Sequence, residues 1–275
     1  MPPPTMSGLD ELKLKSVQVT DSVGEWAQFA IHAFRGLFTR VTQPGVFVNI
    51  FFTIGVQSVP VIFVTGSFIG MVLSVQAYEQ FRSIGFESWL SSMIHQSLIR
   101  ELGPVLAATM LAGRVGSAMA AELGTMRVTD QIDALASLGV DPVHYLVVPR
   151  LLACVLLIPL LVVIANAAGM AGAAIICLFV YRIDPHFYWQ HGTDMIDIWD
   201  IVLNLIKPIV FGGYIALISC HRGFNCKGGS EGVGRAATQA FVWSFVGILA
   251  LDFFLGLVIS AVKVLLVGQN AVKLS

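Results

Sequence analysis

Charged side chains are scarce in this sequence. Asp, Glu, Lys and Arg make up only 12% of its 275 residues, whereas 56% are hydrophobic and the mean hydropathy is +0.80. A soluble domain needs about a quarter of its residues charged to cover its surface, so we expect lipid to cover most of this chain. Uncharged runs of at least about 18 residues support an integral membrane protein. No basic patch with interleaved aromatic residues is present, so we expect no nucleic-acid partner.

Sequence motifs for catalysis and metal binding are also missing. The phosphate-cradling pattern G-x-x-x-x-G-K-[ST] does not occur in the chain, and neither does the zinc-protease pattern H-E-x-x-H. The four cysteines show no C-x-x-C or Cys/His ligand spacing, so we expect reduced thiols and no metal site. We therefore expect a non-catalytic chain without a cofactor of its own. If it works with ATP, another chain must bind the ATP and Mg.

The apolar runs predict an all-α integral membrane protein with five transmembrane helices, at residues 59–77, 92–121, 145–181, 201–221 and 236–262. The charge-free run 46–78 is too long for one upright span of about 20 residues. Gln57 to Pro60 forms a polar break inside this run. We interpret residues 46–56 as an interfacial or re-entrant piece before the first span.

Aromatic residues at helical spacing over residues 21–39 predict an amphipathic helix lying along the membrane surface. The chain is expected to divide into four parts: a disordered cytoplasmic tail (1–20), interfacial amphipathic or re-entrant helices (21–56), a five-span membrane domain (57–265) and a periplasmic tail (266–275). Within the first span, Gly66-x-x-x-Gly70 favours close packing against another helix of the same chain.

The distribution of Lys and Arg near the span ends predicts the orientation. The N-terminal arm and the connections after spans two and four carry most of them, whereas the opposite loops hold only Arg82 and Arg182. The N-terminus is therefore expected in the cytoplasm and the C-terminus on the outer side.

Four charged residues are expected inside the membrane at a similar depth: Arg100, Glu101, Lys207 and Asp252. Each charge left unpaired there would cost about 2.5–3.5 kcal/mol, so two cations and two anions are expected to pair. Pro104 has no N–H for the carbonyl of Arg100, which weakens the helix beside the charged residues. The cluster either holds spans two, four and five together or forms a polar collar around the path of an amphipathic substrate.

A short amphipathic helix is predicted after span two. Thr129 is expected to cap its start, Asp130 and Asp133 suit the positive helix start, and Gly139 is expected to end it. Its apolar stripe is formed by Ile132, Leu135, Ala136 and Leu138. Because so short a helix is marginal alone, the stripe must pack either on the protein's own helix ends or in a groove on a partner.

Three blocks of the sequence resemble the MlaE (YrbE-type) permeases of ABC phospholipid transporters. They begin QSVPVIF at residue 57, RELGPVLAATMLAGRVGSAMAAELGTMRVTDQIDALASLGVDP at residue 100 and GGSEGVGRAATQAF at residue 228. The resemblance implies a homodimer of five-span subunits in the inner membrane of a Gram-negative bacterium. It also implies two cytoplasmic ABC ATPase subunits, often a STAS-domain protein, and a periplasmic hexamer of an MCE-domain protein. The implied cargo is phospholipid moved between the inner and outer membranes, which maintains outer-membrane lipid asymmetry.

The resemblance also implies roles for individual residues. The segment matching 122–141 would be the coupling helix on the ATPase, and its candidate residues are Glu122, Arg127, Thr129, Asp130, Asp133, Leu135 and Leu138. The four intramembrane charges would lie near the lipid cavity, with Tyr78 and Leu102 beside the lipid at the outer ends of spans one and two. The resemblance fixes neither the direction of transport nor the choice between phospholipid and sterol.

Two other functions are compatible with the sequence. The chain could be an ion- or proton-coupled carrier that uses the four intramembrane charges as a relay, or a membrane scaffold that anchors partner proteins. The amphipathic helix and the missing nucleotide motif favour a permease over a carrier. The intramembrane charges argue against a scaffold, because an anchor needs none.

Overall fold

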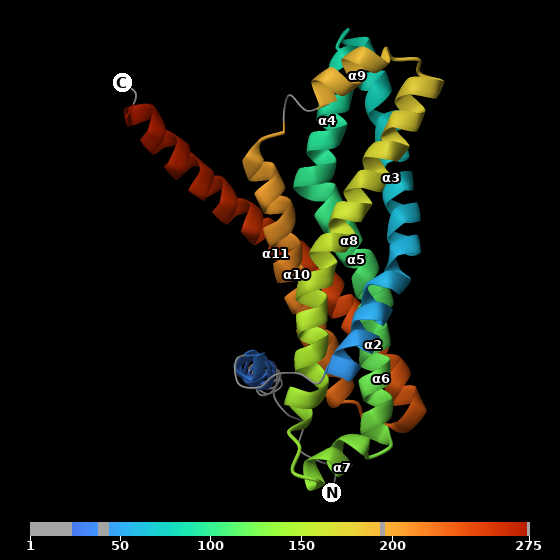
Figure 1. Cartoon of the computed structure of the whole chain (residues 1–275), viewed down its shortest axis with the longest axis vertical. Helices are drawn as coiled ribbons and strands as arrows, with labels where there is room; N and C mark the ends of the chain where they lie inside the picture. The colour runs from blue at the N-terminus through green and yellow to red at the C-terminus, as the bar shows by residue number, and fades with distance from the viewer. Residues whose placement is uncertain (1–23, 38–43, 193–195, 274–275) are drawn as a thin grey trace, which may run out of the picture.

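The computed structural model describes residues 24–37, 44–192 and 196–273, and within these ranges the chain is helical without a strand (Figure 1). Five helical stretches are long and apolar enough to cross a membrane: Phe47–Ser83, Leu90–Val128, Val143–Val180, Trp199–Phe224 and Gly229–Val262. The predicted all-α fold with five spans is therefore confirmed. Most of these stretches extend beyond the apolar cores from which they were predicted, because their polar ends continue the helix.

The first apolar stretch consists of two successive helices. Helix α2 (Pro44–Ile54) passes through a 3₁₀ turn, η1 (Val56–Ser58), into α3 (Val59–Ser83). The turn lies at the predicted polar break, where Pro60 lacks the N–H needed to continue the hydrogen-bond ladder. Helix α2 packs on α8 and leads through η1 into α3. The interfacial or re-entrant position of the segment 46–56 stays a prediction.

The second span contains two π turns. Its elements in order are α4 (Leu90–Ser97), η3 (Leu98–Leu102), α5 (Gly103–Leu111), η4 (Ala112–Gly116) and α6 (Ser117–Val128). Each π turn carries an arginine, Arg100 in η3 and Arg114 in η4. Such turns widen the helix locally and are frequent at functional sites.

The rest of the chain completes the bundle. Its elements are α7 (Gln131–Ser137), η5 (Val143–Val147), α8 (Val148–Ile175), η6 (Ile176–Val180), α9 (Pro185–Gly192), α10 (Ile198–Phe224) and α11 (Gly229–Lys273). Helices α7 and α9 lie at opposite ends of the bundle (Figure 1), which we call the α7 end and the α9 end. The helix of α11 continues to Lys273, so the predicted tail at 266–275 is helical over its described part.

Helix α8 is at the centre of the bundle and packs against α3 and α10. Glycines allow α3 to approach α8 closely, since a Cβ atom would lie 2.5 Å from the carbonyl oxygen of Ala165 at Gly66 and 1.8 Å from that of Gly169 at Gly70. The close intrachain packing predicted from Gly66-x-x-x-Gly70 is confirmed.

Helix α11 packs on α10 and α6 over its first part and then projects away from the bundle (Figure 1). Only 6% of its most apolar 18-residue window is buried. An apolar helix with so little protein around it must be covered by lipid or by another subunit.

Residues 24–37 form a helix that packs on the bundle near its α7 end. Ala30 and Ala33 are buried, and the ring of Phe29 lies edge-on to those of His221 and Phe224 in α10. This is the described part of the amphipathic helix predicted at 21–39. The ends of that prediction and the tail predicted at 1–20 lie outside the described residues.

Candidate functional site

A cluster of five charged residues joins the second, fourth and fifth spans, with Lys207 of α10 at its centre. The Lys207 Nζ atom lies 2.8 Å from Glu101 Oε2 and 2.9 Å from Asp252 Oδ1. The Lys207 side chain is only 2% exposed, so its charge is neutralised by these carboxylates rather than by water. The predicted pairing across the three spans is confirmed for these residues.

The same ammonium group also repairs the backbone of span two. Pro104 has no N–H to donate to the carbonyl oxygen of Arg100, four residues earlier. Lys207 Nζ donates to that oxygen at 3.2 Å. A break in the hydrogen-bond ladder of span two thus becomes a contact that joins α10 to the π turn.

Arg100 has a partner that the sequence did not reveal. Its guanidinium donates two hydrogen bonds to Asp200, from Nε to Oδ1 at 2.7 Å and from Nη2 to Oδ2 at 3.0 Å. Asp200 is buried in the first turn of α10, where it forms a capping box with Asp197. The sequence interpretation placed Asp200 in the outer loop. The Asp-x-x-Asp spacing just before an apolar run was the available signal for a helix start there.

A cavity of about 430 Å³ opens beside this cluster. It is lined by the five charged residues and by apolar residues of α11 that include Phe253, Leu257 and Ile259. A lining that combines charged groups with hydrocarbon suits an amphipathic molecule. Two cations and three carboxylates give the cluster a formal charge of −1.

The other two predicted lipid-path residues do not line this cavity. Tyr78 of α3 stacks on Tyr181 with 3.6 Å between the ring centroids, in a separate packing cluster near the α9 end. Leu102 is half-buried in η3. The structure therefore brings together the four predicted charges and adds Asp200 to them.

The short helix predicted after span two is present as α7, but its start differs from the prediction. Thr129 is not the N-cap, because its hydroxyl donates to the carbonyl of Thr125 and completes α6 instead. Asp130 takes the N-cap position, with a φ of 57° that reverses the chain direction sharply.

The predicted end of α7 at Gly139 is confirmed. Gly139 has a φ of 76°, its N–H donates to the carbonyl of Ala136, and the N–H of Val140 donates to that of Leu135. This pair of bonds is the Schellman motif, which favours glycine because its left-handed conformation is costly for other residues.

The apolar stripe of α7 has two surroundings. Ile132 is buried and Leu135 is half-buried against the protein's own core, whereas Leu138 is 78% exposed. Packing on the protein's own helix ends is therefore confirmed for Ile132 and Leu135. Packing in a groove on a partner stays a prediction, for which Leu138 offers a large exposed apolar side chain at the end of the bundle.

Ion pairs brace the segment around α7. Arg150 of α8 lies 3.0 Å from Glu122 of α6, and Arg127 pairs with Asp133 across the turn into α7. Arg150 is buried, so the pair with Glu122 supplies its counter-charge at the helix end. Among the described residues, no group of three or more His, Cys, Asp or Glu side chains could hold a metal ion.

Five apolar helices, a charge cluster beside an amphipathic cavity and a braced helix projecting at one end define a polytopic membrane protein of the transporter-permease class. The family model described as Permease MlaE matches residues 47–258, which is most of the chain. The chain belongs to the MlaE permease family.

Individual relatives agree with this assignment. The chain is 43% identical over 202 residues to a probable ABC transporter permease protein of Synechocystis, covering 74% of this chain and 77% of that protein. It is 35% identical over 203 residues to the intermembrane phospholipid transport system permease protein MlaE of Haemophilus influenzae, covering 74% and 78%. It is 40% identical over 201 residues to the chloroplastic protein TRIGALACTOSYLDIACYLGLYCEROL 1 of Arabidopsis thaliana, covering 73% and 57%.

Proposed function

We propose that this chain is the permease subunit of an ABC transporter that moves phospholipid between the inner and outer membranes of a Gram-negative bacterium. The observation that carries the proposal is the cavity lined by the intramembrane charge cluster and by apolar residues of α11, in a chain of the MlaE permease family. A phospholipid headgroup would meet the charged residues while the acyl chains lie along apolar residues of α11. The name of the Haemophilus relative supports phospholipid as the substrate class.

The transport energy would come from a separate ATPase that binds ATP and Mg, in two copies per transporter. The α7 end is the docking place that we propose, because Leu138 is exposed there on a helix braced by ion pairs. With the ATPase at the α7 end, the N-terminus would lie in the cytoplasm and, after five spans, the C-terminus in the periplasm. The distribution of Lys and Arg supports the same orientation.

We further propose that two copies of the chain form a homodimer and that a hexamer of an MCE-domain protein docks at the α9 end. The homodimer is supported by α11, whose apolar surface is left uncovered in one copy. A STAS-domain protein would bind the ATPase on the cytoplasmic side. The family resemblance supports these partners.

Three outcomes of one purification separate this function from its alternatives. The chain, extracted under mild conditions, should carry an ABC ATPase and bound phospholipid with it. A pH-gradient-driven flux through the chain alone would instead establish an ion-coupled carrier that uses Arg100, Glu101, Lys207 and Asp252. Partner proteins without any bound lipid or flux would leave the scaffold as the function.

A further inference from the structure

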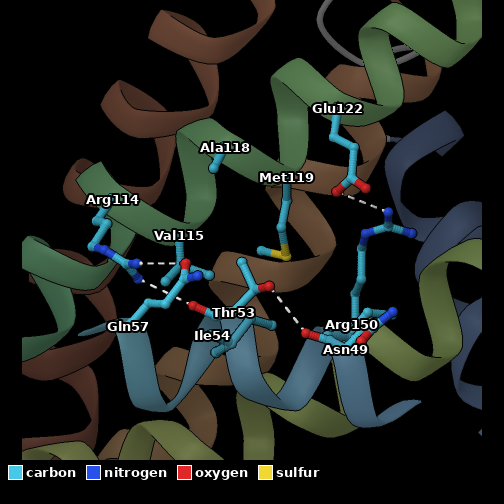
Figure 2. A pocket seen from close by; sticks show the side chains of 11 residues that line it. Asn49, Thr53, Ile54, Gln57, Arg114, Val115, Ala118, Met119, Glu122 and Arg150 are labelled. Carbon is cyan, nitrogen blue, oxygen red and sulfur yellow. Dashed lines mark hydrogen bonds and ion pairs between the residues drawn. The ribbon is translucent and has the colours of Figure 1, made fainter. Parts of the chain in front are cut away.

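Two facing polar stripes lie in the half of the membrane toward α7. Asn49, Thr53 and Gln57 recur at every fourth residue of an otherwise apolar stretch, which places them on one face of the α2 segment. Figure 2 shows them opposite η4 and α6, from which Arg114, Ala118 and Glu122 project with the same spacing. Polar side chains that face only lipid tails would lack hydrogen-bond partners, so their regular spacing indicates that this face does not contact lipid tails alone.

A groove of about 390 Å³ separates the two stripes. Buried apolar side chains close its back, among them Ile54, Val115 and Met119. Thr53 and Ala118 at its sides are exposed. The groove is therefore open to the membrane between α2 and α6.

Arg114 lies at the deep end of this groove. Its guanidinium donates to the carbonyl of Thr53 at 3.3 Å, to the side-chain oxygen of Gln57 at 3.3 Å and to the hydroxyl of Ser58. All three acceptors are uncharged, and no carboxylate of the described residues lies within 4.0 Å of it. A guanidinium has five N–H donors, so two remain for a ligand.

The charge of the groove is positive. At its other end Glu122 and Arg150 neutralise each other at 3.0 Å (Figure 2), which leaves the charge of Arg114 without a counter-charge in the part of the chain that the structure describes. Arg114 lies about 12 Å along the helix from Glu122. A cation at this depth is costly when unpaired, and intramembrane cations commonly mark substrate pathways. The outer cluster, in contrast, has more carboxylates than cations.

We propose that this groove is a second phospholipid site, in which the lipid phosphate binds Arg114 and the acyl chains leave between α2 and α6 into the bilayer. The phosphate supplies the missing negative charge and accepts the two free N–H groups. The site lies about 21 Å along span two from Arg100. The inference rests on the proposed function for the identity of the lipid. It adds a lipid-binding site in the cytoplasmic half of the membrane.

The test uses the assembled transporter in vesicles that contain a phospholipid with a photoreactive diazirine on its headgroup. Headgroups of bulk lipid stay at the membrane surface, so crosslinks on Thr53, Gln57 or Ala118 report a headgroup inside the groove. Peptide mass spectrometry locates the adducts. We expect Arg114→Gln to lower their yield about tenfold, as for loss of a charge-assisted hydrogen bond, and Arg114→Lys to retain most of it.

Arg114→Gln also removes bonds to the end of α2 and could disturb folding. Ala118→Trp fills the groove and keeps the arginine, and we expect it to reduce the adducts to a similar extent. Ala167→Trp is the matched control, because Ala167 is exposed on α8 and does not line the groove. It should leave the adduct yield unchanged.

The proposal is overturned if the wild-type protein forms no adducts in the groove. It is also overturned if Arg114→Gln and Ala118→Trp both give the same adduct yield as wild type. Disulfide formation between two copies of an Ala118→Cys variant would also overturn it and assign the stripes to a subunit interface. Lipid transfer measured in the same vesicles distinguishes failure of the groove site from failure of the proposed function. Transfer without groove adducts removes this site alone, whereas absence of transfer by the intact wild-type assembly counts against the proposed function.

Discussion

At the scale of single residues, Lys207 connects three spans through one ammonium group. It pairs with Glu101 and Asp252 and bonds the carbonyl that Pro104 leaves free. A buried cation that satisfies two carboxylates and a backbone oxygen is difficult to replace, because removing it leaves all three without a partner.

We predict that Lys207→Ala lowers the free energy of unfolding by about 3 kcal/mol, the lower part of the range for breaking a buried ion pair. Glu101 is partly exposed, so water can hydrate its carboxylate once Lys207 is removed. This hydration keeps the expected loss of unfolding free energy in the lower part of the range. The melting temperature of the purified protein in detergent measures the effect. An unchanged melting temperature would show that the cluster contributes nothing to stability.

Charge reversal separates the structural role of the cluster from its role in the lipid path. Lys207→Glu combined with Asp252→Lys keeps one ion pair between α10 and α11 but moves the cation from α10 to α11. We predict that the double variant recovers most of the stability lost by Lys207→Glu, while lipid transfer stays at least about tenfold below wild type, as for a lost charge-assisted contact. Full recovery of transfer would make the cluster purely structural.

The residue-level predictions from sequence succeeded where helix rise and charge pairing determine the outcome. Arg100, Glu101, Lys207 and Asp252 could be placed at one depth because each lies at a countable distance from a span end. The Arg100–Asp200 pair was not predictable in this way. It depends on where α10 begins, and helix starts are less certain than helix centres.

At the scale of helices, the contact between α3 and α8 depends on glycine. We predict that Gly70→Ala destabilises the protein by about 1–3 kcal/mol, as in an overpacked core, because the added Cβ would lie 1.8 Å from the carbonyl oxygen of Gly169. The melting temperature in detergent again measures this. Gly234→Ala in α11 is the control, since no atom lies within 4 Å of a Cβ there, and it should leave the melting temperature unchanged or raise it.

Helix ends show what sequence patterns can and cannot predict. Gly139 could be identified as the end of α7 because few residues other than glycine adopt the required positive φ easily. Thr129 was misassigned because its hydroxyl can either cap the next helix or bond back within the preceding one. That choice depends on the turn at Asp130, whose positive φ was not apparent from the sequence.

The segment 46–56 shows a different difficulty. Length alone indicated that 46–78 was too long for one span, and the sequence interpretation therefore detached its first part. In the structure, α2 and α3 together form one bent stretch that packs along α8. The contact of α2 with α8 could not be predicted from local patterns, and the interfacial or re-entrant position of this segment stays a prediction.

At the scale of the whole molecule, the described chain is one helical bundle with an uncovered helix and two distinct ends. Helix α11 contributes one wall of the outer cavity, yet very little of its apolar surface is buried in one copy. The number of spans and the helical class followed from hydropathy, whereas the relative placement of α8 and α11 depends on contacts between distant residues. An assembled transporter is therefore the proper object for functional tests.

The most direct test of the central claim is ATP-dependent phospholipid transfer by the reconstituted transporter. The account predicts transfer only when the ATPase and ATP are present, and a loss of about tenfold or more in Leu138→Asp, since truncating a central interface side chain costs 2 kcal/mol or more at a hot spot. Ser230→Asp adds the same charge at another exposed position and should transfer normally. Transfer by the isolated chain, or undiminished transfer in Leu138→Asp, would contradict a lipid conduit driven through α7.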